Sequence, residues 1–186
     1  MIEQEYKQLL TAAEYATLLT AFPWEAAVPQ VNHYYTDAAG ALKRDNITVR
    51  IRERMGQFQL QVKSPVREDG ALSVKSEHER PIDSAPASLP SAFLRGLTDI
   101  AVSDITHIGT LTTWRRIYRP HDGVELCLDE SHYFSSADYE LELEYTGTAP
   151  PLKLMESLAA HGIKFDAKTD GKYARFIDAL NTQTER

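Results

Sequence analysis

Apolar and polar residues alternate with a period of two along most of this chain, and no other feature constrains the fold as strongly. In the segment ITVRIRER, Ile47, Val49 and Ile51 alternate with polar residues that include Arg50 and Arg52. Such alternation is typical of β-strands, in which successive side chains point to opposite faces of a sheet. Eight segments show it: 1–10, 31–36, 47–54, 58–64, 73–80, 111–119, 124–131 and 139–145.

Short connections between these segments predict how the strands pair. Gly56 and the dipeptide Asp122-Gly123 offer tight turns, which join antiparallel neighbours. Strands joined in this way favour an antiparallel meander that closes on itself. We therefore expect an α+β protein built on an eight-stranded antiparallel closed barrel.

Three helical patterns lie between the strands, and we expect these few helices to pack outside the barrel. Thr11 and Glu14 have the spacing of a capping box at the start of a helix that Pro23 ends. Pro151 opens a second helix. A third begins near Asp170. Its apolar stripe consists of Tyr173, Phe176, Ile177 and Leu180.

The composition fits a single soluble domain over residues 1–186. The chain has 186 residues, of which 42% are hydrophobic, and its one cysteine, Cys127, excludes an internal disulfide. A net charge of −7 argues against a general nucleic-acid-binding protein, so we expect no nucleic-acid partner. No segment approaches the roughly 18 apolar residues of a membrane span. The first residues are acidic and polar, unlike a signal peptide, so we expect a cytoplasmic protein with no membrane partner.

The charged faces of the predicted strands are sorted by sign. Basic residues stand on the middle strands: Arg50, Arg52, Lys63 and Arg115. Acidic residues stand on the first and last strands: Glu3, Glu5, Glu140, Glu142 and Glu144. A solvated face would explain any single strand, but a solvated surface normally intersperses the two signs. Closure of the barrel would bring the charged faces together inside it.

A divalent cation and a phosphate group would account for both halves of such an interior. Glutamates at alternate positions of one strand repel each other, and a bound cation would relieve that repulsion. Carboxylate oxygens suit hard ions such as Mg²⁺ or Mn²⁺, which are usually shared with phosphates. Guanidinium groups bind phosphate through paired, charge-assisted hydrogen bonds. We therefore expect Mg²⁺ or Mn²⁺ as the cofactor.

Five motifs, in order, give the chain its resemblance to a known superfamily. They are Glu-x-Glu-x-Lys at 3–7, Arg-x-Arg at 50–52, the strand with Lys63, IGTLTTWR at 108–115 and DYELE at 138–142. The set resembles the CYTH superfamily of triphosphate tunnel metalloenzymes, in particular its small bacterial single-domain branch. The resemblance runs nearly end to end and implies an eight-stranded barrel whose hydrophilic tunnel binds a triphosphate moiety.

The resemblance also implies roles for the matching residues. The implied metal ligands are Glu3, Glu5, Glu140 and Glu142, to which the alternation adds Glu144. The implied phosphate-binding residues are Lys7, Arg50, Arg52, Lys63, Arg115, Lys172 and Arg175. Lys172 and Arg175 belong to the segment GKYAR, in which Gly171 replaces the usual serine. Those expected to act in catalysis are Glu3, Glu5, Lys7 and Arg52.

The implied activity is metal-dependent hydrolysis of the terminal phosphate of a triphosphate-containing small molecule. Inorganic tripolyphosphate, thiamine triphosphate and nucleoside triphosphates all remain open as substrates. One alternative is a class IV-type adenylate cyclase that makes cyclic AMP from ATP with the same machinery. A second is a polyphosphate- or nucleotide-binding module without catalysis. Both a monomer and a homodimer are compatible with the sequence.

Overall fold

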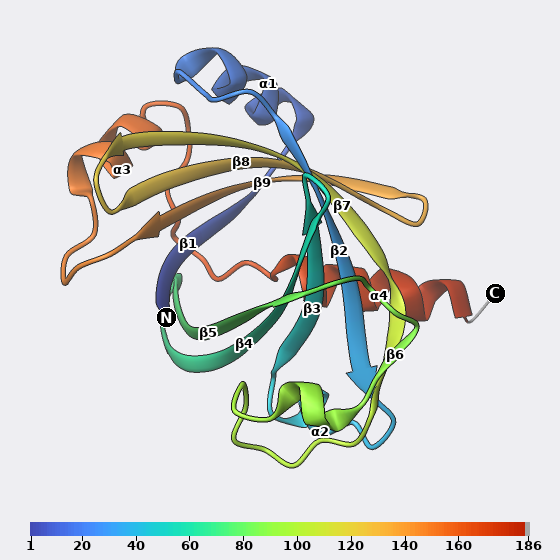
Figure 1. Cartoon of the computed structure of the whole chain (residues 1–186). Coiled ribbons are helices and arrows are strands. Elements are labelled where there is room, and N and C mark those ends of the chain that lie inside the picture. Colours follow the sequence, from blue (N-terminus) through green and yellow to red (C-terminus); the bar gives the residue numbers. More distant parts are fainter. Residues whose placement is uncertain (185–186) are drawn as a thin grey trace.

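The computed structural model describes residues 1–184 and contains a closed, eight-stranded antiparallel barrel (Figure 1). Around the barrel the strands follow the order β2, β3, β4, β5, β1, β9, β8 and β7, and β7 pairs with β2 to close it. The strands are β1 (Ile2–Leu10), β2 (Val28–Asp37), β3 (Thr48–Arg54), β4 (Gln57–Asp69), β5 (Leu72–Ile82), β7 (Ile105–His121), β8 (Val124–Tyr133) and β9 (Ser136–Tyr145). A two-residue strand, β6 (Ser88–Leu89), pairs with β7 outside this ring. The predicted fold class is confirmed.

The turn between β3 and β4 shows how the sequence joins neighbouring strands. β3 ends at Arg54 and β4 begins at Gln57, so the loop has two residues. These are Met55, with φ 52°, and Gly56, with φ 75°. Two positive φ angles are the requirement of the tight hairpin turn whose twist matches that of paired strands. The turn places Arg50 directly opposite Gln61 and Arg52 opposite Gln59.

Helices α1 (Ala12–Ala21) and α3 (Leu152–Ala159) cover the outer face of β1, β5, β8 and β9. In Figure 1, α1 lies above the barrel and α3 beside it. Leu18 of α1 and Leu158 of α3 are buried in one apolar cluster with Leu126 and Leu141 of the strands. The predicted capping box is present, since the Glu14 amide donates to the Thr11 hydroxyl.

A second apolar cluster covers the outer face of β3 and β4. It contains Val49, Ile51 and Leu60 of these strands together with Leu42 and Leu94. Leu42 belongs to α2 (Ala41–Arg44) and Leu94 to a 3₁₀ helix (Ser91–Leu94). Because the apolar side chains of both clusters face outward, the intervening charged residues of the same strands face inward.

Helix α4 (Lys172–Thr184) packs differently from the outer helices. Its Phe176 lies in a cluster with Tyr34, Leu111 and Tyr133. Tyr34 of β2 and Leu111 of β7 each stand two residues from a cavity-lining residue, Asn32 and Thr113, so they share the inner face of their strands. Gly109 makes this approach possible, since a Cβ there would lie 2.8 Å from the Phe176 ring, and its φ of 144° also suits glycine. Helix α4 therefore rests on inward-facing side chains at one end of the barrel.

One strand, β7, is longer than the sequence pattern predicted, and the helices are short. β7 runs over 17 residues and begins at Ile105, six residues before the predicted strand. α4 has 13 residues and α1 has 10. Among residues 1–184, no helix combines the length and the apolar character that a membrane crossing needs.

Candidate active site: a charged tunnel

The interior of the barrel is a charged cavity of about 230 Å³. Alternate residues of each strand line it: Glu3, Glu5 and Lys7 from β1 face Arg50 and Arg52 from β3. The other predicted residues in this lining are Lys63, Arg115, Glu142, Glu144 and Lys172. The structure thus brings together side chains from both ends of the sequence.

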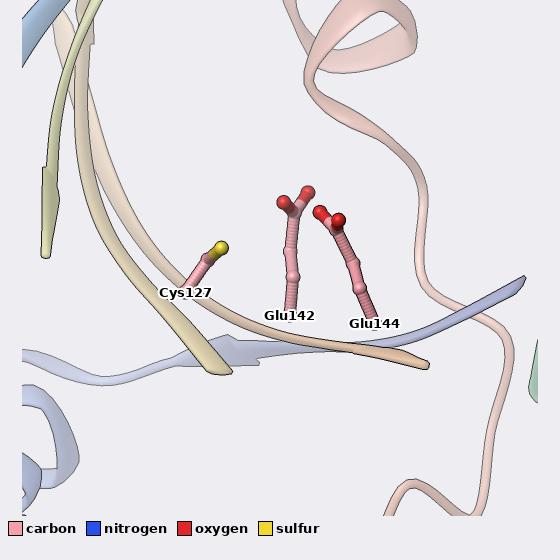
Figure 2. Close-up of side chains that lie close together, drawn as sticks. All are labelled: Cys127, Glu142 and Glu144. Atoms are coloured by element: carbon pink, nitrogen blue, oxygen red, sulfur yellow. The ribbon is translucent and has the colours of Figure 1, made fainter. Parts of the chain in front are cut away.

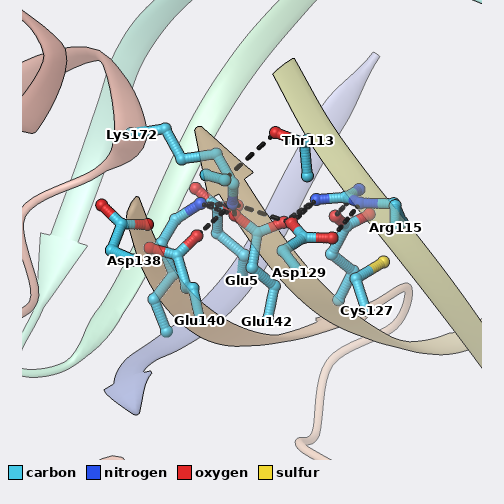
Figure 3. Close-up of polar contacts among 12 residues, drawn as sticks. Glu5, Thr113, Arg115, Cys127, Asp129, Asp138, Glu140, Glu142 and Lys172 are labelled. Atoms are coloured by element: carbon cyan, nitrogen blue, oxygen red, sulfur yellow. Dashed lines mark hydrogen bonds and ion pairs between the residues drawn. The ribbon is translucent and has the colours of Figure 1, made fainter. Parts of the chain in front are cut away.

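Glu140 and Arg175 lie beside the cavity in a buried ionic cluster. Arg175 donates to Glu140 at 2.8 Å through Nη1 and to Asp138 at 2.8 Å through Nε. Lys172 also donates to Glu140, as Figure 3 shows. Burial raises the pKa of Glu140, although Lys172 and Arg175 oppose this shift. α4 therefore reaches the carboxylates of β9 through two cations.

Glu142 lies at the centre of the acidic side of the tunnel. Its Oε1 accepts from Lys7 Nζ at 2.6 Å. The same oxygen accepts from Lys172 Nζ at 2.9 Å, and the other oxygen accepts from Arg115 (Figure 3). Burial alone would favour the neutral acid, but these three cations hold the pKa of Glu142 well below its usual range. Glu142 is therefore ionised at neutral pH.

All three guanidinium nitrogens of Arg115 face carboxylates. Its Nε and Nη2 donate to Asp129 at 2.9 and 2.6 Å, Nη2 also donates to Glu142, and Nη1 lies 3.6 Å from Glu144. Despite burial, which opposes it, Asp129 and Glu142 raise the pKa of Arg115 well above its usual value. Asp129 itself is completely buried.

The predicted metal ligands fall into two groups of carboxylates. The oxygens of Glu3, Glu5 and Glu144 lie within 4.8 Å of one another. Glu140 and Glu142 form a second group of this kind with Asp129. Strand register is the reason, because β1 and β9 place Glu5 opposite Glu144 and Lys7 opposite Glu142.

The first group has the chemistry that a hard divalent cation requires. All its ligand atoms are carboxylate oxygens, and burial together with Glu142 and Glu3 raises the pKa of Glu144 to about 7. Lysines pair with the other two members, with Lys63 2.6 Å from Glu3 and Lys75 3.1 Å from Glu5. Glu144 is thus the carboxylate of this group whose negative charge is least balanced by a nearby cation. A bound divalent cation would provide the missing positive charge.

Cys127 is a buried thiol beside these carboxylates. Figure 2 shows it on the same side of the sheet as Glu142 and Glu144, with ligand atoms within 4.8 Å. Its Sγ donates to Glu125 at 3.3 Å. Burial raises the pKa of the thiol well above its ordinary value, and the neighbouring carboxylates raise it further. A protonated thiol is neither a nucleophile nor a good metal ligand.

The β3 side of the tunnel has a different electrostatic character. Arg50, Arg52 and Arg54 stand at alternate positions and all line the cavity. Burial lowers the pKa of Arg52 to about 9, and the positive charges of Arg50 and Arg115 contribute. Positive charge therefore exceeds negative charge on this side.

Several tunnel residues were not among the predicted site residues. Lys75 shares its strand face with Glu77, and that alternation was a usable signal. Asn32 and Gln61 contact the two arginines, but a neutral amide adds nothing to a charge pattern. Asp138, which binds Arg175, is the first residue of the DYELE motif.

Comparison with known proteins places this architecture in a family. Residues 1–174 match the CYTH domain. The match spans most of the chain and includes the strands that carry the charged tunnel. The chain therefore belongs to the CYTH domain family.

Three relatives extend over nearly the whole chain. "Putative triphosphatase YjbK" of Bacillus subtilis (strain 168) is 28% identical over 182 residues, which are 95% of this chain and 95% of that protein. A crystal structure named as a putative adenylate cyclase of Bacillus halodurans is 27% identical, with a TM-score of 0.70 and coverage of 92% and 95% of the two chains. "Putative adenylyl cyclase HpAC1" of Hippeastrum, reported with a dominant triphosphatase activity, is 24% identical, with a TM-score of 0.74 and coverage of 95% and 96%. The similarity to HpAC1 shows that the two proteins share a fold.

Proposed function

We propose that this protein is a metal-dependent triphosphatase that hydrolyses the terminal phosphate of an inorganic or organic triphosphate. One observation carries the proposal: one cavity joins a group of carboxylate oxygens to arginines of β3 that form no ion pair with a carboxylate among residues 1–184. A polyanion with a divalent cation complements both sides at once. The relative YjbK, with its name of triphosphatase, supports the same activity.

The metal would be held on the acidic side of the tunnel. Glu3, Glu5 and Glu144 are the first candidates, and Glu140 and Glu142 remain the other proposed ligands. When bound, Mg²⁺ or Mn²⁺ would neutralise phosphate oxygens and polarise the terminal phosphoryl group.

The cationic residues would bind and align the phosphates. Arg50 and Arg52 would hold phosphate oxygens from the β3 side and stabilise the charge that spreads over them during transfer. Further phosphate contacts would come from Lys7, Lys63, Arg115 and Lys172, which line the same cavity, and from Arg175 beside it.

Glu5 would orient the attacking water. Burial opposes its ionisation, but Lys7 and Lys75 lower the pKa of Glu5 to about 2. An ionised carboxylate accepts hydrogen bonds, so its oxygens can align a water molecule for in-line attack on the terminal phosphorus. Lys7, 2.6 Å from Glu5, would keep that carboxylate ionised during the reaction.

The test is a substrate panel with the purified full chain. Tripolyphosphate, thiamine triphosphate and ATP are incubated with Mg²⁺ or Mn²⁺ from neutral to alkaline pH, and phosphate release is measured. We expect release from at least one substrate and its loss with EDTA. Glu142→Gln should reduce turnover by about 10²- to 10³-fold while the circular dichroism spectrum stays that of a folded protein. Full activity of this variant would contradict the assignment of the site.

The runner-up activity is cyclisation of ATP, favoured by the name of the Bacillus halodurans relative. The same cavity would bind the phosphates, and the ribose hydroxyl would replace water as the nucleophile. Analysis of the ATP reaction for cyclic AMP distinguishes the two activities. Binding of triphosphates without any turnover would instead indicate a binding module.

A further inference from the structure

Neutral amides hold Arg50 and Arg52 in place. Arg50 Nε donates to Gln61 Oε1 at 2.7 Å, and Arg52 Nε donates to Asn32 Oδ1 at 3.1 Å. Within residues 1–184, neither guanidinium group has an ion pair with a carboxylate. Arg50 is buried and Arg52 is half-buried, and the charge of an arginine removed from water is normally compensated by an acid.

Strand register builds these two contacts. β2 places Asn32 directly opposite Arg52, and β4 places Gln61 directly opposite Arg50. Both amides are buried, with exposed fractions of 1% for Asn32 and 2% for Gln61. A polar side chain at such depth is stable only when it is hydrogen-bonded, so each amide is tied to its arginine.

A carboxylate does lie nearby, but Gln61 separates it from Arg50. The Gln61 amide nitrogen donates to Glu79, and Gln59 Nε2 donates to the same carboxylate at 2.7 Å. Because the Gln61 nitrogen faces Glu79, its oxygen must face Arg50. The charge of Glu79 therefore stays one side chain away from the guanidinium group.

The contacts leave the outer nitrogens of both arginines available to the cavity. Within the described part of the chain, residues 1–184, only Nε of each makes a hydrogen bond, whereas Nε, Nη1 and Nη2 of Arg115 all face carboxylates. The two Nη groups present the paired donors that recognise a phosphate group. A carboxylate at Asn32 or Gln61 would compete with phosphate for the same positive charge.

We propose that Asn32 and Gln61 are positioning residues that orient Arg52 and Arg50 through neutral hydrogen bonds and thereby reserve their charge for the phosphates of the ligand. The inference rests on the proposed triphosphatase function, because it names the residues that tune its phosphate-binding side. Burial is the main cause that lowers the pKa of Arg52 to about 9, Arg50 and Arg115 add to the shift, and Glu77 offsets only part of it.

The sharpest test exchanges a carboxylate and an amide without changing the net charge. In the double variant Gln61→Glu/Glu79→Gln, Gln at position 79 can still donate to position 61, and Arg50 can still donate to it. Only the place of the negative charge changes. Binding of inorganic tripolyphosphate is measured by titration calorimetry, in EDTA and in Mg²⁺. We expect the dissociation constant to rise about 10- to 100-fold, with the melting temperature at or above that of the wild type.

A single-atom variant tests the second amide. Asn32→Asp keeps the oxygen that accepts from Arg52 and adds a negative charge beside it. We expect a similar weakening of tripolyphosphate binding and a KM increase that exceeds any change in kcat. Asn181→Asp, on the exposed side of α4, adds the same charge elsewhere and should bind as the wild type does.

The outcomes separate this inference from the proposed function. Wild-type-like or tighter binding by both variants overturns the positioning role, because a purely structural contact would tolerate a negative charge at positions 32 and 61. Weaker binding with unchanged melting temperatures supports it. If the wild type binds tripolyphosphate but releases no phosphate, the triphosphatase proposal fails while the binding test still decides the role of the amides. No binding at all by the wild type overturns both.

Discussion

The cations on the two sides of the tunnel differ in the side chains that bind them. On the acidic side, Arg115 and Lys172 are bound by buried carboxylates, among them Asp129 and Glu142. On the β3 side, amides hold Arg50 and Arg52. Buried charges that lack a counterion are costly, whereas paired ones become part of the folded structure. The carboxylates therefore compensate the first set before any ligand binds, whereas the second set, as we propose, is compensated by the phosphates of the ligand.

Removal of a paired cation should give the largest effect on stability. Lys172 lies within 2.9 Å of Asp129 and Glu142 and also contacts Glu140. Lys172→Met leaves these buried carboxylates short of a positive charge, so we expect the free energy of unfolding to fall by about 3–5 kcal/mol. Urea denaturation at pH 7 measures this change.

Lys168→Met is the matched control for that variant. Lys168 pairs with Glu68 at 2.6 Å, but both side chains are exposed. Such surface pairs contribute about 0–1 kcal/mol, so this variant should differ little from the wild type. Equal losses in the two methionine variants would contradict the structural role of Lys172.

Removal of an uncompensated cation should affect function and spare stability. We expect Arg52→Ala to lower the turnover of tripolyphosphate by about 10²- to 10³-fold, because a donor to the transferred phosphoryl group is lost. The free energy of unfolding should stay unchanged or rise, since a half-buried charge that forms no ion pair with a carboxylate is removed. Steady-state kinetics and urea denaturation on the same preparation measure both quantities. A loss of stability as large as that of Lys172→Met would remove the distinction between the two sides.

Glu144 has the longest ion pair of its carboxylate group, 3.6 Å to Arg115, and it predicts a pH dependence. Burial and the charges of Glu142 and Glu3 raise the pKa of Glu144 from 4.5 to about 7. The folded state therefore favours the protonated acid, and its contribution to stability is lost as the pH rises from about 4.5 to about 7. In EDTA, the melting temperature of the wild type should fall over this range more steeply than that of Glu144→Gln. Parallel pH profiles would show that the shift is absent.

Addition of Mg²⁺ or Mn²⁺ provides the complementary measurement, with the smallest expected change. A cation bound to the ionised carboxylates stabilises the folded state by mass action. At pH 8 the metal should raise the melting temperature of the wild type more than that of Glu144→Gln. An equal response of both proteins would place the metal away from Glu144.

The strand pattern made most of the fold predictable. Alternation is a local property, so segments such as 47–54 and 139–145 identified their strands without knowledge of the partner strands. The start of β7 was not predicted, because the segment around Gly109 lacks clear alternation and its backbone is shaped by contact with Phe176. α2 has only four residues, too few for a helical period to be recognised.

The site was predictable to the extent that its residues carry charge. Arg50 and Arg52 were identified by sign and motif, and the structure places both in the cavity. Asn32 and Gln61 were not, because an amide in a strand has many roles and only its contact with an arginine distinguishes this one.

The sequence by itself determined which face of each strand is charged and which sign it carries, since side-chain direction follows from alternation within a single strand. Only the tertiary structure decided the partners. It set Lys7 opposite Glu142, Glu5 opposite Glu144 and Asn32 opposite Arg52. The physical reason is that these pairings depend on the register of strands far apart in the chain and on closure of the barrel, so a local pattern does not specify which charges meet.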